Sequence, residues 1–148
     1  MMRHSRLEHQ FVPRIPRAVE PGVLYISMEH GTAIHSCCCG CGEEVVTPFT
    51  PTDWKMTYDG ESVSLHPSIG NWQLACRSHY IIDRGQVIEA GPWTRRQIAV
   101  EQDRDKRAKG QYYASRDVVP PVDAPVSPVA SEPGRRAGFW SWLRNLFG

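Results

Sequence analysis

Residues 35–42 read HSCCCGCG and hold four of the five cysteines of this 148-residue chain. Four cysteines within five positions are too close together for ordinary disulfide loops. The first twenty residues show no apolar stretch typical of a signal peptide, so we expect a cytoplasmic protein whose thiols stay reduced. Reduced cysteines gathered in this way favour a zinc (Zn2+) site with tetrahedral thiolate ligands. The stretch therefore predicts a small domain whose fold depends on a bound metal.

The spacing of these cysteines indicates which of them face the metal. Side chains two residues apart share one face of an extended strand. The thiols of Cys37, Cys39 and Cys41 therefore point one way together with His35, whereas Cys38 points the other way. The glycines at 40 and 42 allow the backbone to curl around an ion. Three of the four clustered cysteines are thus expected to be ligands.

A further ligand must come from a distant part of the chain, and Cys76 supplies it, three residues before His79. The three cysteines above and Cys76 would form a closed, structural site and leave both His35 and His79 free. Alternatively, His79 joins three cysteines, or two cysteines and a histidine leave a position open for water, as in catalytic zinc sites. Buried free cysteines, a redox pair and an iron–sulfur cluster are less favoured interpretations.

Short runs of β-type residues separated by turn residues fill the region from Gly22 to Glu89. The runs are residues 23–27, 33–37, 44–49, 54–58, 62–66, 79–83 and 86–89. Asp59 and Gly60 form a strong hairpin signal, and residues 83–85 indicate a second hairpin. No run keeps a 3.6-residue period, so the sequence predicts a mainly β fold. We expect a small antiparallel, zinc-stapled β domain over residues 1–93.

The rest of the chain is predicted to be a helix, a linker and a terminal motif. A capping box formed by Thr94 and Gln97 predicts a helix over residues 94–110. Residues 111–134 are rich in proline and small residues, which is typical of a disordered linker. Residues 135–148 form a short amphipathic motif, expected to bind a membrane surface, bind a partner's groove or dock on its own β domain.

The charges are nearly balanced, with 17 basic and 16 acidic residues and a formal net charge of +1. Such a chain has no strong field to attract a polyanion over a distance, so nucleic acid is not expected as a partner. The terminal motif is the one feature that suggests a peripheral membrane location.

Four blocks of the sequence together resemble a bacterial family found in ubiquitination-like operons. The blocks are LYIS at 24–27, HSCCCGCG at 35–42, SLHPSIGNW at 64–72 and CRSHY at 76–80, within a match of roughly residues 11–93. The family is often called BubE, and its members occur beside ubiquitin-like proteins and E1- and E2-like enzymes. The resemblance implies a peptidase that acts on the ubiquitin-like protein, with the operon's enzymes as further partners.

Two details qualify this resemblance. Cys38 occupies a variable position of the family pattern His-x-Cys-x-Cys-Gly-Cys-Gly, which agrees with the strand alternation. Members have often carried the label ammonia monooxygenase, but nothing in this sequence resembles the membrane-embedded copper centre of that enzyme.

The sequence offers the groups that acyl transfer needs, namely a hydroxyl nucleophile, a base and an oxyanion donor. Ser68 lies in PSIGN at 67–71, with Asn71 as an oxyanion donor, and Ser78 is the rival nucleophile. His79 and His35 are the candidate bases. The ordinary alternatives are a turn serine for Ser68 and a zinc ligand or a satisfied strand histidine for His79.

Three functional hypotheses follow. The favoured one is a zinc-stabilised peptidase that processes or deconjugates a ubiquitin-like protein with a serine nucleophile. A metallopeptidase with a zinc-bound water and Glu43 or Glu44 as base is less favoured, because several thiolates quench the Lewis acidity of the metal. The third is a non-catalytic zinc-ribbon-like module that binds protein or nucleic acid and is tethered to a surface by its C-terminal motif.

Overall fold

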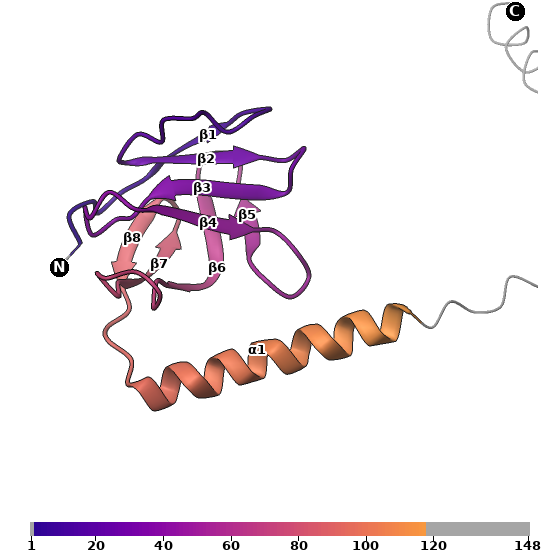
Figure 1. Cartoon of the computed structure of the whole chain (residues 1–148). Coiled ribbons are helices and arrows are strands. Elements are labelled where there is room, and N and C mark those ends of the chain that lie inside the picture. The colour runs from indigo at the N-terminus through magenta and orange to yellow at the C-terminus, as the bar shows by residue number, and fades with distance from the viewer. Residues whose placement is uncertain (1, 118–148) are drawn as a thin grey trace, which may run out of the picture. The chain divides into compact units, whose positions relative to one another are not determined.

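The computed structural model describes residues 2–117, which form two four-stranded sheets and one helix (Figure 1). The first sheet has the order β1 (Glu8–Phe11), β2 (Val23–Ser27), β3 (Thr32–Ser36), β4 (Glu44–Pro48). The second has the order β5 (Lys55–Tyr58), β6 (Val63–Gly70), β7 (His79–Asp83), β8 (Gln86–Glu89), and helix α1 (Arg95–Arg116) follows. The predicted mainly β fold is confirmed, and seven strands overlap the predicted runs.

Strand β1 corrects the expectation of a wholly antiparallel domain. It pairs with β2 in parallel, with Glu8 opposite Val23 and Phe11 opposite Ile26, while the other neighbouring strands are antiparallel. The four residues EHQF are mostly exposed and have no apolar alternation, so no sequence pattern marks them as a strand. A connection between residues 12 and 22 returns the chain to enter β2 in the same direction, which makes the pair parallel.

Strand β6 is longer than expected. The predicted run ends at His66, directly before Pro67, which has no N–H for a ladder hydrogen bond. The register of β6 against β7 instead shifts between Leu65 and Ile69, and the strand continues to Gly70. An irregularity of this kind absorbs a proline and redirects side chains. It places Ser68 within β6.

The core lies between the two sheets and draws on both. Its fully buried side chains are Leu24, Ile26 and Ala33 of the first sheet, and Val63, Leu65, Tyr80 and Ile82 of the second. Burial of each large aliphatic side chain contributes about 1.5–3 kcal/mol to stability. Cys37 and Cys38 are buried in the same cluster, so the cysteine segment is part of the core.

Helix α1 begins at the predicted capping box. The Thr94 hydroxyl accepts from the Gln97 backbone N–H at 3.3 Å, and the Gln97 side chain accepts from the Thr94 backbone N–H at 2.8 Å. The helix continues past Gly110 to Arg116, into residues 111–116 that the sequence analysis assigned to the linker. An exposed glycine costs a helix only about 1 kcal/mol, so Gly110 does not end it.

The helix makes few contacts with the sandwich. Ile98 is its buried residue, and Lys109 forms an ion pair with Asp53 at 2.6 Å. No helical segment among the described residues combines the length and apolar character needed to cross a membrane. The rest of the predicted linker and the amphipathic motif at 135–148 lie outside the described residues.

Candidate active site and metal centre

The cysteine segment is a tight turn between β3 and β4. The Cys37 backbone N–H donates to the Glu43 carbonyl at 2.8 Å, and the Gly40 N–H donates to the Cys37 carbonyl at 3.0 Å. Gly40 has a φ of 90°, and a Cβ at this position would lie 2.5 Å from Cδ of Arg3. The positive φ favours glycine here, and a larger residue would also displace the side chain of Arg3.

The structure brings together four thiols, those of Cys37, Cys39, Cys41 and Cys76. Their sulfur atoms all lie within 4.8 Å of one another. The Sγ of Cys37 is 3.5 Å from that of Cys39 and 3.9 Å from that of Cys76. Tetrahedral zinc with Zn–S bonds of about 2.3 Å separates its sulfurs by about 3.8 Å, so this cluster has the right size and chemistry for the ion. Cys38 is buried outside the cluster.

Ser78 and Asn71, which the sequence suggested for catalysis, lie beside these thiols. The Ser78 Oγ is 3.1 Å from Sγ of Cys37 and 3.4 Å from Sγ of Cys76. The Asn71 side-chain amide donates to the Ser78 hydroxyl at 2.9 Å and reaches the Cys37 sulfur at 3.7 Å. Partial burial acts to raise the pKa of Cys76, but hydrogen bonds from Ser78 and from neighbouring thiols lower the pKa to about 7. Both residues therefore lie where they would hold the thiols in place around a bound metal ion.

His35, the second candidate base, is buried in the core. Its Nε2 is 2.8 Å from the Tyr80 hydroxyl, and its Nδ1 has no hydrogen-bond partner among the described residues. Burial lowers the pKa of His35 to about 4, so the ring is neutral at pH 7. The structure does not bring His35 to Ser68.

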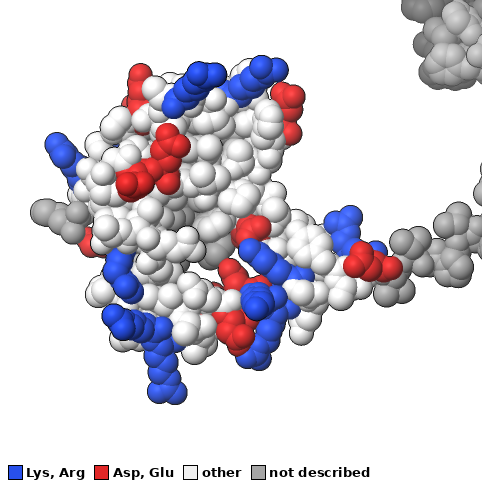
Figure 2. Space-filling model, in the orientation of Figure 1, with Lys and Arg blue, Asp and Glu red and all other residues white. Residues whose placement is uncertain are grey.

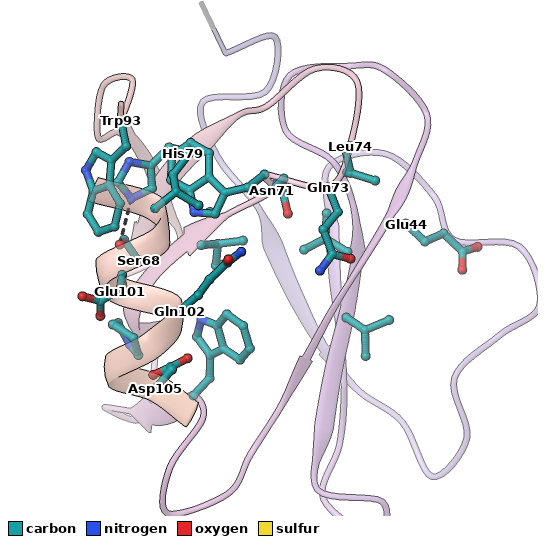
Figure 3. Close-up of a pocket in the computed structure, with 18 residues that line it drawn as sticks. Glu44, Ser68, Asn71, Gln73, Leu74, His79, Trp93, Glu101, Gln102 and Asp105 are labelled. Atoms are coloured by element: carbon teal, nitrogen blue, oxygen red, sulfur yellow. Dashed lines mark hydrogen bonds between the residues drawn. The ribbon is translucent and has the colours of Figure 1, made fainter. Parts of the chain in front are cut away.

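Ser68 and His79 do come together, across the pairing of β6 with β7. Gly70 lies opposite His79 in the register, and the Ser68 Oγ is 2.9 Å from the His79 Nε2 (Figure 3). The His79 Nδ1 is 2.9 Å from the Gly91 carbonyl oxygen, which can only accept a hydrogen bond. Nδ1 therefore carries the proton, and Nε2 accepts from the Ser68 hydroxyl. This is the arrangement in which a histidine activates a serine nucleophile.

Two tryptophans flank the His79 ring. The ring centroids of Trp72 and Trp93 each lie 4.9 Å from that of His79, and the two indoles stack on each other at 5.6 Å. His79 is only 6% exposed, so its orientation is fixed by these rings and by its two hydrogen bonds. Neither tryptophan nor Gly91 was predicted as a site residue, because Trp72 lies in the turn after β6 and residues 91–93 come after the last strand.

A cleft of about 510 Å³ opens beside Ser68 and His79. Strand β4 contributes Glu44 and Val46, and α1 contributes Glu101, Gln102 and Asp105 (Figure 3). Acidic and basic side chains lie together where the helix meets the sandwich (Figure 2). The volume lies within the range of sites that bind small molecules or segments of chain. The contribution of α1 was not predicted, because nothing in the helix sequence shows which strand it approaches.

The contact of Ser68 with His79 beside a cleft is typical of serine hydrolases, and the four clustered cysteines could hold a metal ion. The sequence profile of BubE, described as a bacterial ubiquitination-like system serine protease, matches residues 11–90, which is more than half of the chain, and the chain belongs to this family. The resemblance read from the sequence is thereby confirmed. No curated protein and no solved structure matches the chain significantly. Ser68, His79 and the four clustered cysteines lie inside the matched region, whereas Gly91, Trp93 and α1 follow it.

Proposed function

We propose that this protein is a serine peptidase that cleaves a bacterial ubiquitin-like protein at its C-terminus, either to mature it or to release it from conjugates. The observation that carries the proposal is the 2.9 Å contact between Ser68 Oγ and His79 Nε2 beside a cleft. The family description supplies the reaction class and the ubiquitination-like setting.

The reaction follows from the hydrogen bonds around His79. The Ser68 oxygen attacks the carbonyl carbon of the scissile peptide bond while its proton moves to the His79 Nε2. The imidazolium then gives this proton to the leaving amine, and the C–N bond breaks to leave an acyl ester on Ser68. Water, activated by the same Nε2, hydrolyses the ester and restores the hydroxyl. Throughout, the Gly91 carbonyl holds the proton on Nδ1 and keeps Nε2 directed at Ser68.

In this proposal the metal is structural. Four thiolates would fill the coordination sphere of a zinc ion and leave no position for water or substrate. A bound ion would tie the turn after β3 to Cys76, which precedes His79 by three residues in the chain. It would thereby fix the position of β7, which carries His79, relative to the first sheet.

The test uses a ubiquitin-like protein of a bacterial ubiquitination-like operon, extended at its C-terminus by a short peptide. Wild type should remove the extension, and Ser68→Ala and His79→Ala should each lower the rate by at least about a thousandfold. Ser78→Ala, compared at matched zinc content, is the control for the rival nucleophile, because that hydroxyl lies beside the thiols and not beside His79, and it should still cleave. Cleavage is followed by mass spectrometry.

A serine-reactive fluorophosphonate gives a second readout that needs no protein substrate. It should label Ser68 in wild type and label neither Ser68→Ala nor His79→Ala. Equal cleavage by Ser68→Ala would refute the serine mechanism. A zinc-loaded wild type that neither cleaves nor becomes labelled would instead support the non-catalytic binding module.

A further inference from the structure

Strand β4 has one open edge. It is the last strand of the first sheet, paired with β3 on one side only. In Figure 1 it is the strand of the first sheet nearest to α1, and the cleft that both elements line contains Glu44 and Val46. The side chain of Val46 is 53% exposed, so no part of the described chain covers it fully. An uncovered strand edge is a template for another strand.

The hydrogen bonds of the hairpin show which groups of β4 point to that edge. The Cys37 N–H donates to the Glu43 carbonyl at one end of the hairpin, and the Phe49 N–H donates to the Gly31 carbonyl at the other end. In an antiparallel pair, alternate residues direct their main-chain groups toward the partner strand. Odd-numbered residues of β4 therefore bond to β3, and the N–H and C=O groups of residues 44 and 46 point away from it.

The open edge has a defined length. Pro48 has no N–H, and its carbonyl accepts from the Trp54 backbone N–H at 3.2 Å. Beyond this residue the edge is closed by the chain itself. What remains is the pair Glu44 and Val46, with two donors and two acceptors, in the same cleft as Ser68 and His79.

We propose that the segment of substrate next to the scissile bond binds in extended form as an added strand on β4, paired with the main-chain groups of Glu44 and Val46. This inference rests on the proposed function for the identity of the substrate. An extended polypeptide is the ligand whose alternating N–H and C=O groups fit such an edge. Helix α1 then forms the opposite wall, and the added strand leads to Ser68. A folded surface of the partner would not satisfy these groups.

The first test modifies the substrate and leaves the protein intact. The probe is a ten-residue peptide with the tail sequence of the ubiquitin-like protein that spans the bond wild type cleaves. Each backbone nitrogen outside the scissile bond is N-methylated in turn. Because the carbonyls of Glu44 and Val46 accept from substrate N–H groups two residues apart, methylation at those two positions should lower kcat/KM about tenfold, with little effect at the position between them or elsewhere. A uniform effect, or none, would overturn the inference.

The second test changes the protein. Val46→Pro removes an N–H that the ladder with β3 does not use, and prolines are tolerated on edge strands. It should raise KM for the ubiquitin-like substrate about tenfold while kcat changes little. Tyr58→Pro is the matched control: it removes an outward N–H from β5, the edge of the second sheet, whose residues do not line the cleft. It should leave KM unchanged.

The two proposals fail in different ways. If wild type cleaves no ubiquitin-like substrate, the proposed function is wrong. If wild type cleaves the substrate but Val46→Pro and Tyr58→Pro have equal KM values, only the strand pairing is wrong. Thermal unfolding shows whether both variants fold, and if Val46→Pro does not, the methylated peptides on wild type decide the question.

Discussion

His79 is held so that one ring nitrogen remains for chemistry. A backbone carbonyl, that of Gly91, takes the place next to Nδ1 that a carboxylate has in many serine hydrolases. A carbonyl has only a partial negative charge, so it fixes the tautomer but stabilises an imidazolium less than a carboxylate does. Aromatic faces also attract cations, and Trp72 and Trp93 are both 4.9 Å from the ring. We therefore expect these tryptophans to position His79 and to stabilise its protonated form.

This expectation can be tested at Trp93. Trp93→Leu removes one aromatic face, and we expect fluorophosphonate labelling of Ser68 to slow about tenfold or more, because small misplacements of a catalytic group are costly. Trp93→Phe keeps an aromatic face and should retain most of the rate. The labelling is measured by mass spectrometry at matched zinc content. Equal rates for the leucine and phenylalanine variants would show that the aromatic ring has no such role.

Residue spacing predicted which thiols gather, but it did not predict which side chains contact one another. The alternation of Cys37, Cys39 and Cys41 selected thiols that the structure places together, although they lie on a turn and not on a strand. It did not show whether His79 faces the metal or Ser68. That choice is made by the register of β6 against β7, which depends on a strand irregularity after Leu65.

At the scale of the elements, the sequence predicted strands with apolar runs and missed those without. β1 shows no apolar alternation because its own residues are mostly exposed, and it forms a strand only through its pairing with β2. β6 continues through Pro67 because its register against β7 shifts there. The start of α1 was predictable from local capping chemistry, whereas its end was not, since Gly110 is a weak stop in an exposed helix. The approach of elements distant in the sequence, such as α1 and β4 on two sides of one cleft, has no local signal.

Few contacts hold α1 in place, so a single substitution can test whether its position matters for the cleft. Besides the buried Ile98, the ion pair of Lys109 with Asp53 fastens its far half. We expect Lys109→Met to increase hydrogen exchange in α1 and to raise KM for the ubiquitin-like substrate by a few fold, since such pairs contribute about 0.2–1 kcal/mol. Lys106→Met, at an exposed position of the same helix, is the control. No difference between the two variants would mean that the ion pair does not hold the helix.

The same ion pair predicts a dependence on pH. Partial burial acts to raise the pKa of Asp53, but hydrogen bonds from Lys109 and Thr50 outweigh it and hold the pKa below its usual range. The stabilisation is therefore complete above the unfolded-state pKa of about 4 and is lost as the pH falls through the lower native value. Hydrogen exchange in α1 of wild type should approach that of Lys109→Met only below about pH 4. Convergence already at pH 6 would contradict this assignment.

At the scale of the whole molecule, the thiol cluster joins the two sheets. Three of the thiols follow β3 and the fourth precedes β7, so a bound ion would close a long loop that contains three strands, β4, β5 and β6. The binding free energy of a structural zinc is folding free energy, about 10 kcal/mol or more. We expect one equivalent of zinc per chain, and Cys39→Ser or removal of the metal by a chelator should unfold residues 2–117. Metal content and thermal unfolding measure this.

Cys38→Ala is the matched control for that experiment. Cys38 is buried but lies outside the cluster, so its replacement should keep one equivalent of zinc and cost only the small cavity, on the order of 1 kcal/mol. A metal-free protein with the thermal stability of wild type would show that the sandwich does not need the ion.

Replacement of the metal separates a structural from a catalytic ion. Cd2+ is also soft and accepts four thiolates, so the domain should refold around it and unfold cooperatively. If Ser68 is the nucleophile, the refolded cadmium form should cleave the ubiquitin-like substrate within a few fold of the zinc form, because no step uses a metal-bound water. Loss of cleavage in a cadmium protein that is folded, and whose Ser68 still reacts with fluorophosphonate, would assign the metal a direct part in catalysis. The four-thiolate cluster and the separate contact of Ser68 with His79 favour the first outcome.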